Sequence, residues 1–275
     1  MNLLWAVLII LGVTVVTITA MLLVRRRAPA GSFFENGDRA AGVFGVLATG
    51  FAVLIGFVVF LAFESFDTSR SGGETEARVL AQQFETAQFL PEPAASQLSG
   101  ELICYGRDVV HEEWSAMRSG TLSDGLNPWT VAMFHTLKTA EPRTPAEQAA
   151  YAKWLDQGSD RENARADRVH GAEGVIPSPL WIVLFVSAGA IFAFMLLFAD
   201  SAEAAFVQAT MMGALAIVLS SMFLLLWFLD NPYTNGIGGL KPVAMERTLG
   251  LLDQAVPQTG KHIVPPCDAN GLARS

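Results

Sequence analysis

The chain has 275 residues, of which 52% are hydrophobic and only 16% are charged, and its formal net charge is −8. So apolar a composition argues against an ordinary soluble domain, and the negative charge argues against nucleic acid as a partner. The two cysteines are too few for a metal cluster or a disulfide framework.

Four apolar stretches are long enough to cross a bilayer as helices. They are Leu3–Val24, Ala41–Phe63, Leu180–Ala199 and Phe206–Leu229. The last two contain no Asp, Glu, Lys, Arg or His and are separated by six residues, which predicts a tight antiparallel hairpin. The fold class that we expect is all-α, with four transmembrane helices and an α-helical bundle inserted between spans 2 and 3.

The domain organisation follows from the positions of these spans. Residues 1–63 hold the first two spans and a basic loop, 64–179 form a polar acidic insert, 180–229 form the hairpin and 230–275 form a polar tail. Within the tail we expect one short amphipathic helix over 242–252. The last twenty residues are expected to be loose.

The first span is followed at once by Arg25-Arg26-Arg27. A cleaved signal peptide carries its basic residues before the apolar core, so this order predicts a retained span. Basic residues at membrane ends favour the cytoplasm, which places the acidic insert outside. Arginines near the ends of the insert, such as Arg70 and Arg168, act in the opposite direction, so a cytoplasmic insert stays open.

The second span carries small residues at a spacing of three to four, which places them on one helix face: Ala41, Gly45, Ala48, Ala52 and Gly56. Such a face allows another helix to approach closely. Phenylalanines along the same span also fit the alternative of a pore-lining helix with apolar constrictions. The predicted pore-lining or helix-packing face comprises Gly45, Thr49, Ala52, Gly56 and Phe60.

The polar insert has the apolar periodicity of helices and no stretch that alternates like a strand. Ser71-Gly72-Gly73 predicts a break, after which helices are expected over 74–90, 94–118, 128–138 and 145–172. The inward positions expected on the second of these helices are Leu98, Leu102, Tyr105, Val109 and Trp114. Two of these helices begin with recognisable caps, Asn127-Pro128 and Thr144 with Glu147 three residues later.

The ionisable residues of the insert favour ion pairing over catalysis. His111-Glu112-Glu113 lacks the second histidine of a metalloprotease motif, and the chain has no glycine-rich phosphate loop or nucleophile elbow. We therefore expect no enzyme activity, no metal site and no cofactor. Arginines of the last predicted helix are expected to pair with acids of the second, in a candidate network of Glu112, Glu113, Arg165 and Arg168.

Cys104 and Cys267 lie on the same side of the membrane in any four-span topology. On an oxidising side they could form a disulfide that closes a long loop, whereas on the cytoplasmic side both would be free thiols. The sequence leaves both outcomes open.

Short motifs occur in a fixed order across most of residues 40–250. They are Glu74-x-Glu76-Ala77, Tyr105 followed by His111-Glu112-Glu113-Trp114, Arg165-x-x-Arg168, Pro177-x-x-Leu180-Trp181 and a span-end motif of Leu229 followed by Asp230, Asn231, Pro232 and Tyr233. Together with the order of spans and insert, they resemble the bacterial bestrophin-like proteins of unknown function. That family usually ends its last span with Asp-x-Pro-Phe-x-Gly, whereas here tyrosine replaces phenylalanine and Gly236 lies one place late.

The resemblance implies a likeness to bestrophins, which are pentameric anion channels with both termini and the large helical part in the cytoplasm. It implies a multi-pass, homo-oligomeric protein of the bacterial plasma membrane with ions as candidate cargo. It also implies a cytoplasmic insert, whereas the arginines after the first span indicate an insert outside. We expect a channel-like or pore-like protein with the acidic insert outside, where its charge would concentrate cations. The alternative is a non-conducting scaffold or sensor whose acidic helices bind a partner protein.

Overall fold

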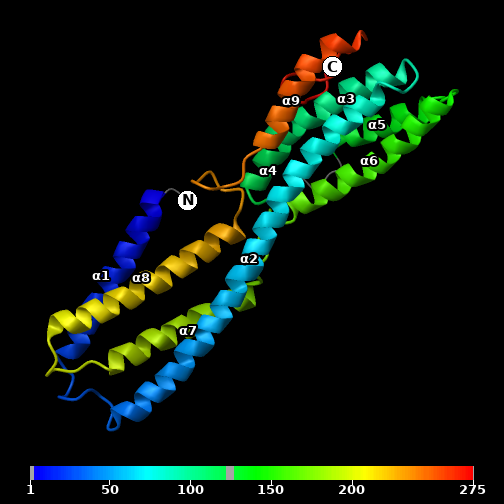
Figure 1. The fold of residues 1–275 in the computed structure, drawn as a ribbon. Helices are drawn as coiled ribbons and strands as arrows, with labels where there is room; N and C mark the ends of the chain where they lie inside the picture. The colour runs from blue at the N-terminus through cyan, green and yellow to red at the C-terminus, as the bar shows by residue number, and fades with distance from the viewer. Residues whose placement is uncertain (1–2, 122–126, 275) are drawn as a thin grey trace. The chain divides into compact units, whose positions relative to one another are not determined.

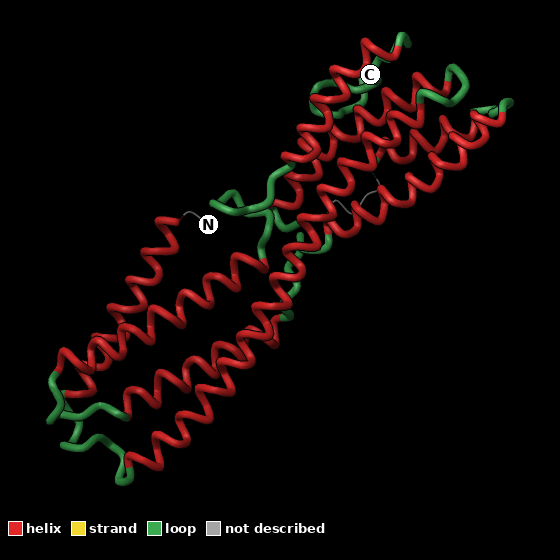
Figure 2. Tube along the Cα trace, in the orientation of Figure 1, coloured by secondary structure: helices red, strands yellow, loops and turns green. Residues whose placement is uncertain are grey.

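The computed structural model describes residues 3–121 and 127–274. Figure 1 and Figure 2 show helices joined by loops, and the described residues contain no strand. The helices are α1 (Leu3–Arg25), α2 (Gly37–Ala87), α3 (Ala94–Asp108), the π-helical η1 (Val109–Glu113), α4 (Trp114–Arg118), α5 (Pro128–Thr139), α6 (Pro145–Val169), α7 (Ser178–Leu197), α8 (Ala205–Asp230), α9 (Val243–Ala255) and the 3₁₀-helical η2 (Val256–Thr259). The all-α prediction is confirmed.

Four of these helices, α1, α2, α7 and α8, are long and apolar enough to cross a membrane. They contain the four predicted spans to within a few residues, except that α2 continues far beyond its apolar part. The chain divides into two compact units. The membrane unit comprises Met1–Glu64, Val175–Asp230 and Asn235–Gly238, and the polar unit comprises Ser65–Gly174, Asn231–Thr234 and Gly239–Ser275.

The membrane unit packs through small and apolar side chains. The first part of α2 buries Phe51, Ile55, Val58 and Ala62, which recur at helical spacing. Between α1 and α8, Gly213 allows close contact, because a Cβ added there would lie 3.1 Å from Ile18 Cδ1. This packing follows the general rule that small residues let membrane helices approach each other.

The predicted break at Ser71-Gly72-Gly73 is wrong, because α2 continues through it without interruption. A Cβ added at Gly72 would lie 2.5 Å from the backbone nitrogen of Arg168 and 2.9 Å from the carbonyl oxygen of Ala164. The glycine therefore serves the close approach of α6 to α2 and not a turn.

The polar unit is a helical bundle formed by the second part of α2 with α3 to α6 and α9 (Figure 1). The helix expected over 94–118 forms as α3, η1 and α4 in direct succession. Its inward positions are buried as predicted: Leu98, Leu102, Tyr105, Val109 and Trp114. Asn127 caps α5, and Thr144 and Glu147 form the expected capping box at the start of α6.

The end of the chain is held in place, contrary to the loose tail expected from the sequence. Cys267 is fully buried and bridges to Ala273 through a short antiparallel contact. Asp268 Oδ1 accepts hydrogen bonds from the backbone nitrogens of Asn270 and Leu272. Local hydrogen bonds and burial together fix this segment, and composition alone did not indicate either.

Candidate functional site

A buried ionic cluster lies at the centre of the polar unit, and we call it the Arg168 cluster. Its members are Glu76, Tyr105, Glu113, Arg165 and Arg168. The guanidinium of Arg168 is 0% exposed and binds the carboxylates of both Glu76 and Glu113. Arg165 Nε lies 3.1 Å from Glu113 Oε1, so two arginines balance two glutamates. A buried charge is tolerated only when it is paired in this way.

Neutral groups complete the coordination of the Arg168 cluster. The Tyr105 hydroxyl donates to Glu76, and the Trp114 ring lies 5.5 Å from the guanidinium carbon of Arg168. The Tyr233 hydroxyl donates to the backbone oxygen of Arg168. Each of these contacts fixes the arginine more firmly, as expected for a polar network inside a packed core.

The environment of the cluster changes the proton affinities of its members. Burial acts to raise the pKa of Glu113, but Arg168 and Arg165 outweigh it and the net pKa is lowered. Burial acts to lower the pKa of Arg168, and the two glutamates outweigh it, so the pKa is raised well above its usual value. Each charge of this pair therefore stabilises the other.

Asp108 lies at the edge of the Arg168 cluster and is bound there by Asn127. Asn127 Nδ2 donates to Asp108 Oδ2 at 2.7 Å and to Glu113 Oε1 at 3.1 Å, while Asn127 Oδ1 caps α5. Burial, followed by the charges of Glu113 and Glu112, raises the pKa of Asp108 to about 6. This carboxylate therefore approaches protonation near neutral pH.

Three residues of the candidate ion-pair network come together, and the fourth does not. Glu113, Arg165 and Arg168 are joined, whereas the side chain of Glu112 is exposed and lies outside the cluster. The π-helical segment Val109–Glu113 widens one turn, which changes the face on which neighbouring residues lie. The predicted network therefore has to be corrected by leaving out Glu112.

Sequence reasoning about sites missed Glu76 and Tyr105. The signal was available for Glu76, because it precedes Leu80 and Phe84 at helical spacing on the buried side of α2. Tyr105 was placed inward but was not connected to a charge. A buried position that carries an ionisable residue predicts an oppositely charged partner.

The residues of the span-end motif take structural positions. In the membrane unit, Asp230 Oδ1 accepts hydrogen bonds from the backbone nitrogens of Val175 at 2.7 Å and Ile176 at 2.9 Å. In the polar unit, the carbonyl oxygen of Pro232 accepts from the Leu240 nitrogen at 2.8 Å. Asn231, also in the polar unit, accepts from the Thr234 nitrogen through its carbonyl oxygen.

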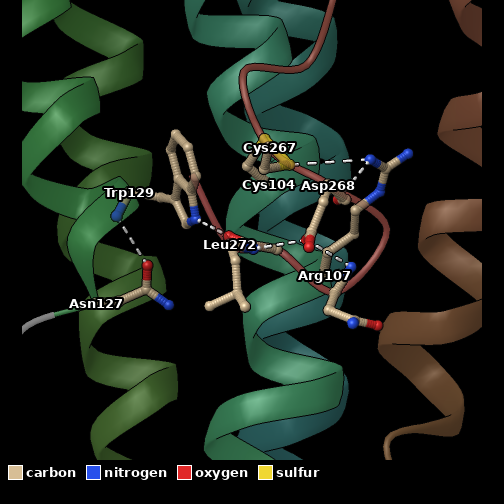
Figure 3. Close-up of a disulfide and its surroundings, with 9 residues drawn as sticks. Cys104, Arg107, Asn127, Trp129, Cys267, Asp268 and Leu272 are labelled. Carbon is tan, nitrogen blue, oxygen red and sulfur yellow. Dashed lines mark hydrogen bonds between the residues drawn. A yellow bond between two sulfur atoms is a disulfide. The ribbon is translucent and has the colours of Figure 1, made fainter. Parts of the chain in front are cut away.

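Cys104 of α3 and Cys267 of the tail form a disulfide with a Cα–Cα distance of 5.7 Å (Figure 3). Arg107 Nη1 donates to the carbonyl oxygen of Asp268, and Trp129 Nε1 donates to that of Gly271. The tail is thus attached to α3 and α5. Gly271 has a positive φ of 91°, and a Cβ added there would lie 2.4 Å from the Asp108 nitrogen, so only glycine fits.

The predicted pore-lining or helix-packing face of α2 is open in the single chain. All its members, Gly45, Thr49, Ala52, Gly56 and Phe60, are exposed. A Cβ added at Gly45 or Gly56 would have no heavy atom within 4 Å. The opposite face holds the buried residues of the same helix, so α2 has one packed face and one face without a partner in this chain.

A family model described as Bestrophin-like domain matches residues 29–238. The chain belongs to the bestrophin-like family. This confirms the resemblance seen in the ordered motifs, and no curated protein sequence matches the chain significantly.

Solved structures share the fold of this bestrophin-like protein at low identity. A point mutant of a bacterial bestrophin homologue from Klebsiella pneumoniae is 10% identical over 92% of this chain and 99% of its own, with a TM-score of 0.67. A second mutant of that homologue is 12% identical over 92% and 99%, with a TM-score of 0.68. A structure described as a mutated membrane protein is 13% identical over 95% and 100%, with a TM-score of 0.65. The bestrophin-like protein is thus a multi-pass membrane protein.

Proposed function

We propose that this bestrophin-like protein forms a homo-oligomeric channel with the open face of α2 lining its pore. The observation that carries the proposal is the contrast between the two faces of one helix. Phe51, Ile55 and Val58 are buried, whereas Gly45, Ala52 and Gly56 are exposed. A helix surface that faces lipid does not require small residues. Small residues are required where helices are in close contact or where the helix lines a water-filled pore.

The same face indicates where such a pore would be narrowest. On this face Gly45, Ala52 and Gly56 are small, and the next member, Phe60, is bulky and 60% exposed. A ring of phenylalanines from several copies would form an apolar constriction of the kind that gates by dewetting.

Flux measurements on matched variants test the pore. We expect Phe60→Ala to increase ion flux into liposomes several-fold, because it removes the constriction. Phe57→Ala is the control, since Phe57 is equally exposed but lies off the small-residue face. A protein that is monomeric in mild detergent, or equal flux from both variants, would overturn the proposal. A stable oligomer without any flux would favour the non-conducting scaffold or sensor.

We also propose that the polar unit lies outside the cytoplasm. Two independent features support this side. The basic run Arg25-Arg26-Arg27 follows α1 directly, and the disulfide between Cys104 and Cys267 belongs to an oxidising compartment. In intact cells, a membrane-impermeant thiol reagent should label a cysteine introduced by Arg143→Cys, because the side chain at this position is 81% exposed. Labelling only after cell lysis would place the polar unit in the cytoplasm.

The charge of the chain favours cations as the conducted ions. The polar unit is acidic, and an acidic domain at a channel mouth raises the local concentration of cations and lowers that of anions. The reversal potential under a tenfold salt gradient measures this preference directly. A reversal potential whose sign indicates anion selectivity would contradict the preference for cations. It would not affect the proposed pore-lining role of α2.

A further inference from the structure

The membrane unit contains a groove lined by α1, α7 and α8, which are labelled in Figure 1, and none of the roles above uses it. Its cavity volume is about 500 Å³, within the range of about 300–1,000 Å³ that is typical of ligand pockets. None of the described lining residues is ionisable. The hydroxyl of the lining residue Ser220 is used within its own helix, because it donates to the Ala216 carbonyl oxygen at 2.6 Å. The groove therefore offers an occupant apolar contact and no charge.

Aromatic side chains build the wall of this groove between α7 and α8. The rings of Phe185 and Phe223 stack with their centroids 4.8 Å apart and their planes at 5°. The Trp181 ring lies 5.8 Å from the first and 6.4 Å from the second. Rings arranged in this way support one another, so the wall is formed before anything binds. Phe185 is nevertheless 59% exposed, which leaves this wall open to the outside of the chain.

The groove has the length of one leaflet of a bilayer. The α7 residues that line it run from Trp181 to Phe192, a rise of about 16 Å at 1.5 Å per residue. Half of a hydrocarbon core of ~30 Å is about 15 Å. Trp181 lies in the first turn of α7 and Trp227 in the last turn of α8, and tryptophans near the ends of spans lie at the level of the lipid head groups. The groove thus runs from the head groups to the middle of the membrane.

The end of the groove away from these tryptophans is closed by the contact between α1 and α8. A Cβ added at Gly213 would lie 3.1 Å from Ile18 Cδ1 and 3.7 Å from Thr14 Cγ2. Gly213 precedes the lining residue Leu219 on α8, on the side opposite to Trp227. An occupant that enters beside the tryptophans can therefore extend only as far as this contact.

The surroundings of the groove indicate what occupies it. Ile182 and Val186, which are neighbours of its lining on α7, are 63% and 66% exposed. Such apolar surface on a membrane span is solvated by lipid, so the groove is continuous with the lipid-facing surface. A spanning helix from a second copy would cross both leaflets, whereas the groove ends after one. The acyl chain of a lipid has the polarity and the length that the groove requires.

We propose that this groove binds one acyl chain of a membrane lipid from the leaflet on the side of Trp181 and Trp227. The chain lies against the rings of Phe185 and Phe223, and the lipid head group stays outside the groove. The proposal goes beyond the channel function and does not depend on it. It gives α1, α7 and α8 a binding role of their own.

A phospholipid with brominated acyl chains tests this proposal, because bromine quenches the fluorescence of nearby tryptophans. The full-length protein is freed of lipid in detergent and titrated with this phospholipid, and native mass spectrometry counts the lipids that stay bound. We expect quenching that saturates at one lipid per chain. Brominated phosphatidylglycerol and phosphatidylethanolamine should bind within about twofold of each other, because apolar area and not the head group supplies the affinity. Quenching that rises without saturation, or binding of one head group alone, would overturn the proposal.

Gly189→Phe is the decisive variant. Gly189 lines the groove, and a Cβ added there would have nothing within 4 Å, so the new ring fills the space without displacing backbone. We expect the saturable quenching and the bound lipid to be lost, while the unfolding midpoint in lipid-free detergent stays unchanged. Gly12→Phe on α1 is the matched control, because a Cβ added there also meets nothing within 4 Å and the residue does not line the groove.

Three results would contradict the site. They are unchanged lipid binding in Gly189→Phe, an equal loss of binding in Gly12→Phe, and a lower oligomeric mass of lipid-free Gly189→Phe. The last result would show that a second copy of the chain, and not a lipid, covers the groove.

The position of the bromine along the chain tests the direction in which the lipid lies. Trp181 and Trp227 line the groove near the ends of their spans. Bromine close to the head group should therefore quench more strongly than bromine close to the terminal methyl group. The reverse order would mean that the lipid does not enter from the leaflet on the side of these tryptophans, and it would overturn the assignment.

Discussion

The two units of this protein hide their polar groups in different ways. In the membrane unit the helices α1, α7 and α8 contain few buried side chains, because lipid solvates their apolar surfaces and the backbone satisfies itself within each helix. In the polar unit, water surrounds the bundle, and a buried core is held by the Arg168 cluster and a disulfide. The solvent around a helix bundle thus decides how many buried ion pairs and covalent links the bundle requires.

Breaking the Arg168 cluster should have the largest effect. Arg168→Met leaves the buried Glu76 without a cationic partner and leaves Glu113 with Arg165 alone, and we expect a loss of about 3–5 kcal/mol in stability. Chemical unfolding in detergent, followed by tryptophan fluorescence, measures it. The matched control is Arg70→Gln, whose pair with Glu74 is 60% exposed on both sides and is worth at most about 1 kcal/mol. Equal losses of stability in the two variants would show that burial does not make the Arg168 ion pairs more important for stability than an exposed pair.

Removing the disulfide should have the next largest effect. Cys104 and Cys267 are 163 residues apart, and both are 0% exposed. Loss of a disulfide that closes a long loop costs about 2–5 kcal/mol, so Cys104→Ser with Cys267→Ser should unfold at clearly lower denaturant concentration. Reducing agent under denaturing conditions should weaken the unmodified protein and leave the double variant unaffected. A reductant effect in both would assign the change to another cause.

The stability of the membrane unit should depend on the packing of its side chains and not on ion pairs. Gly213→Leu introduces a side chain against Ile18 of α1, and overpacking of this kind costs about 1–3 kcal/mol. Gly189→Leu on α7 is the control, because an added Cβ there would have nothing within 4 Å. Thermal unfolding in detergent should distinguish the two. A lower midpoint for Gly189→Leu alone would show that the open surface of α7 is packed against something else.

The sequence predicted the membrane unit better than the polar unit, for a physical reason. Bilayer-spanning helices follow from local hydropathy, and the four spans were therefore found. Gly72 was misjudged because its purpose depends on α6, nearly one hundred residues away. Glu112 was chosen beside Glu113 because a π-helical turn cannot be read from periodicity. The pairing of Cys104 with Cys267 depends on the redox state of the compartment and on the distance between the two residues in the fold. Local sequence predicts neither of these.

The smallest expected effect concerns Asp108, a buried acid of the polar unit whose negative charge is unfavourable in the folded state. Burial and the neighbouring Glu113 and Glu112 raise the pKa of Asp108 to about 6, so the folded state binds this proton more tightly than the unfolded chain. Stability from this group is therefore highest at low pH and falls as the pH rises toward 6. We expect Asp108→Asn to stabilise the protein by about 1–2 kcal/mol at pH 8, since each pKa unit corresponds to about 1.4 kcal/mol and partial solvation reduces the total.

The pH dependence of that difference separates charge from shape. Near pH 4, Asp108 is protonated in the folded state, so Asp108→Asn and the unmodified protein should have nearly equal unfolding midpoints. An asparagine oxygen can still accept the hydrogen bond from Asn127 Nδ2, which keeps the contact to the cap of α5. A stability difference that is the same at pH 4 and pH 8 would mean that the substitution acts through packing.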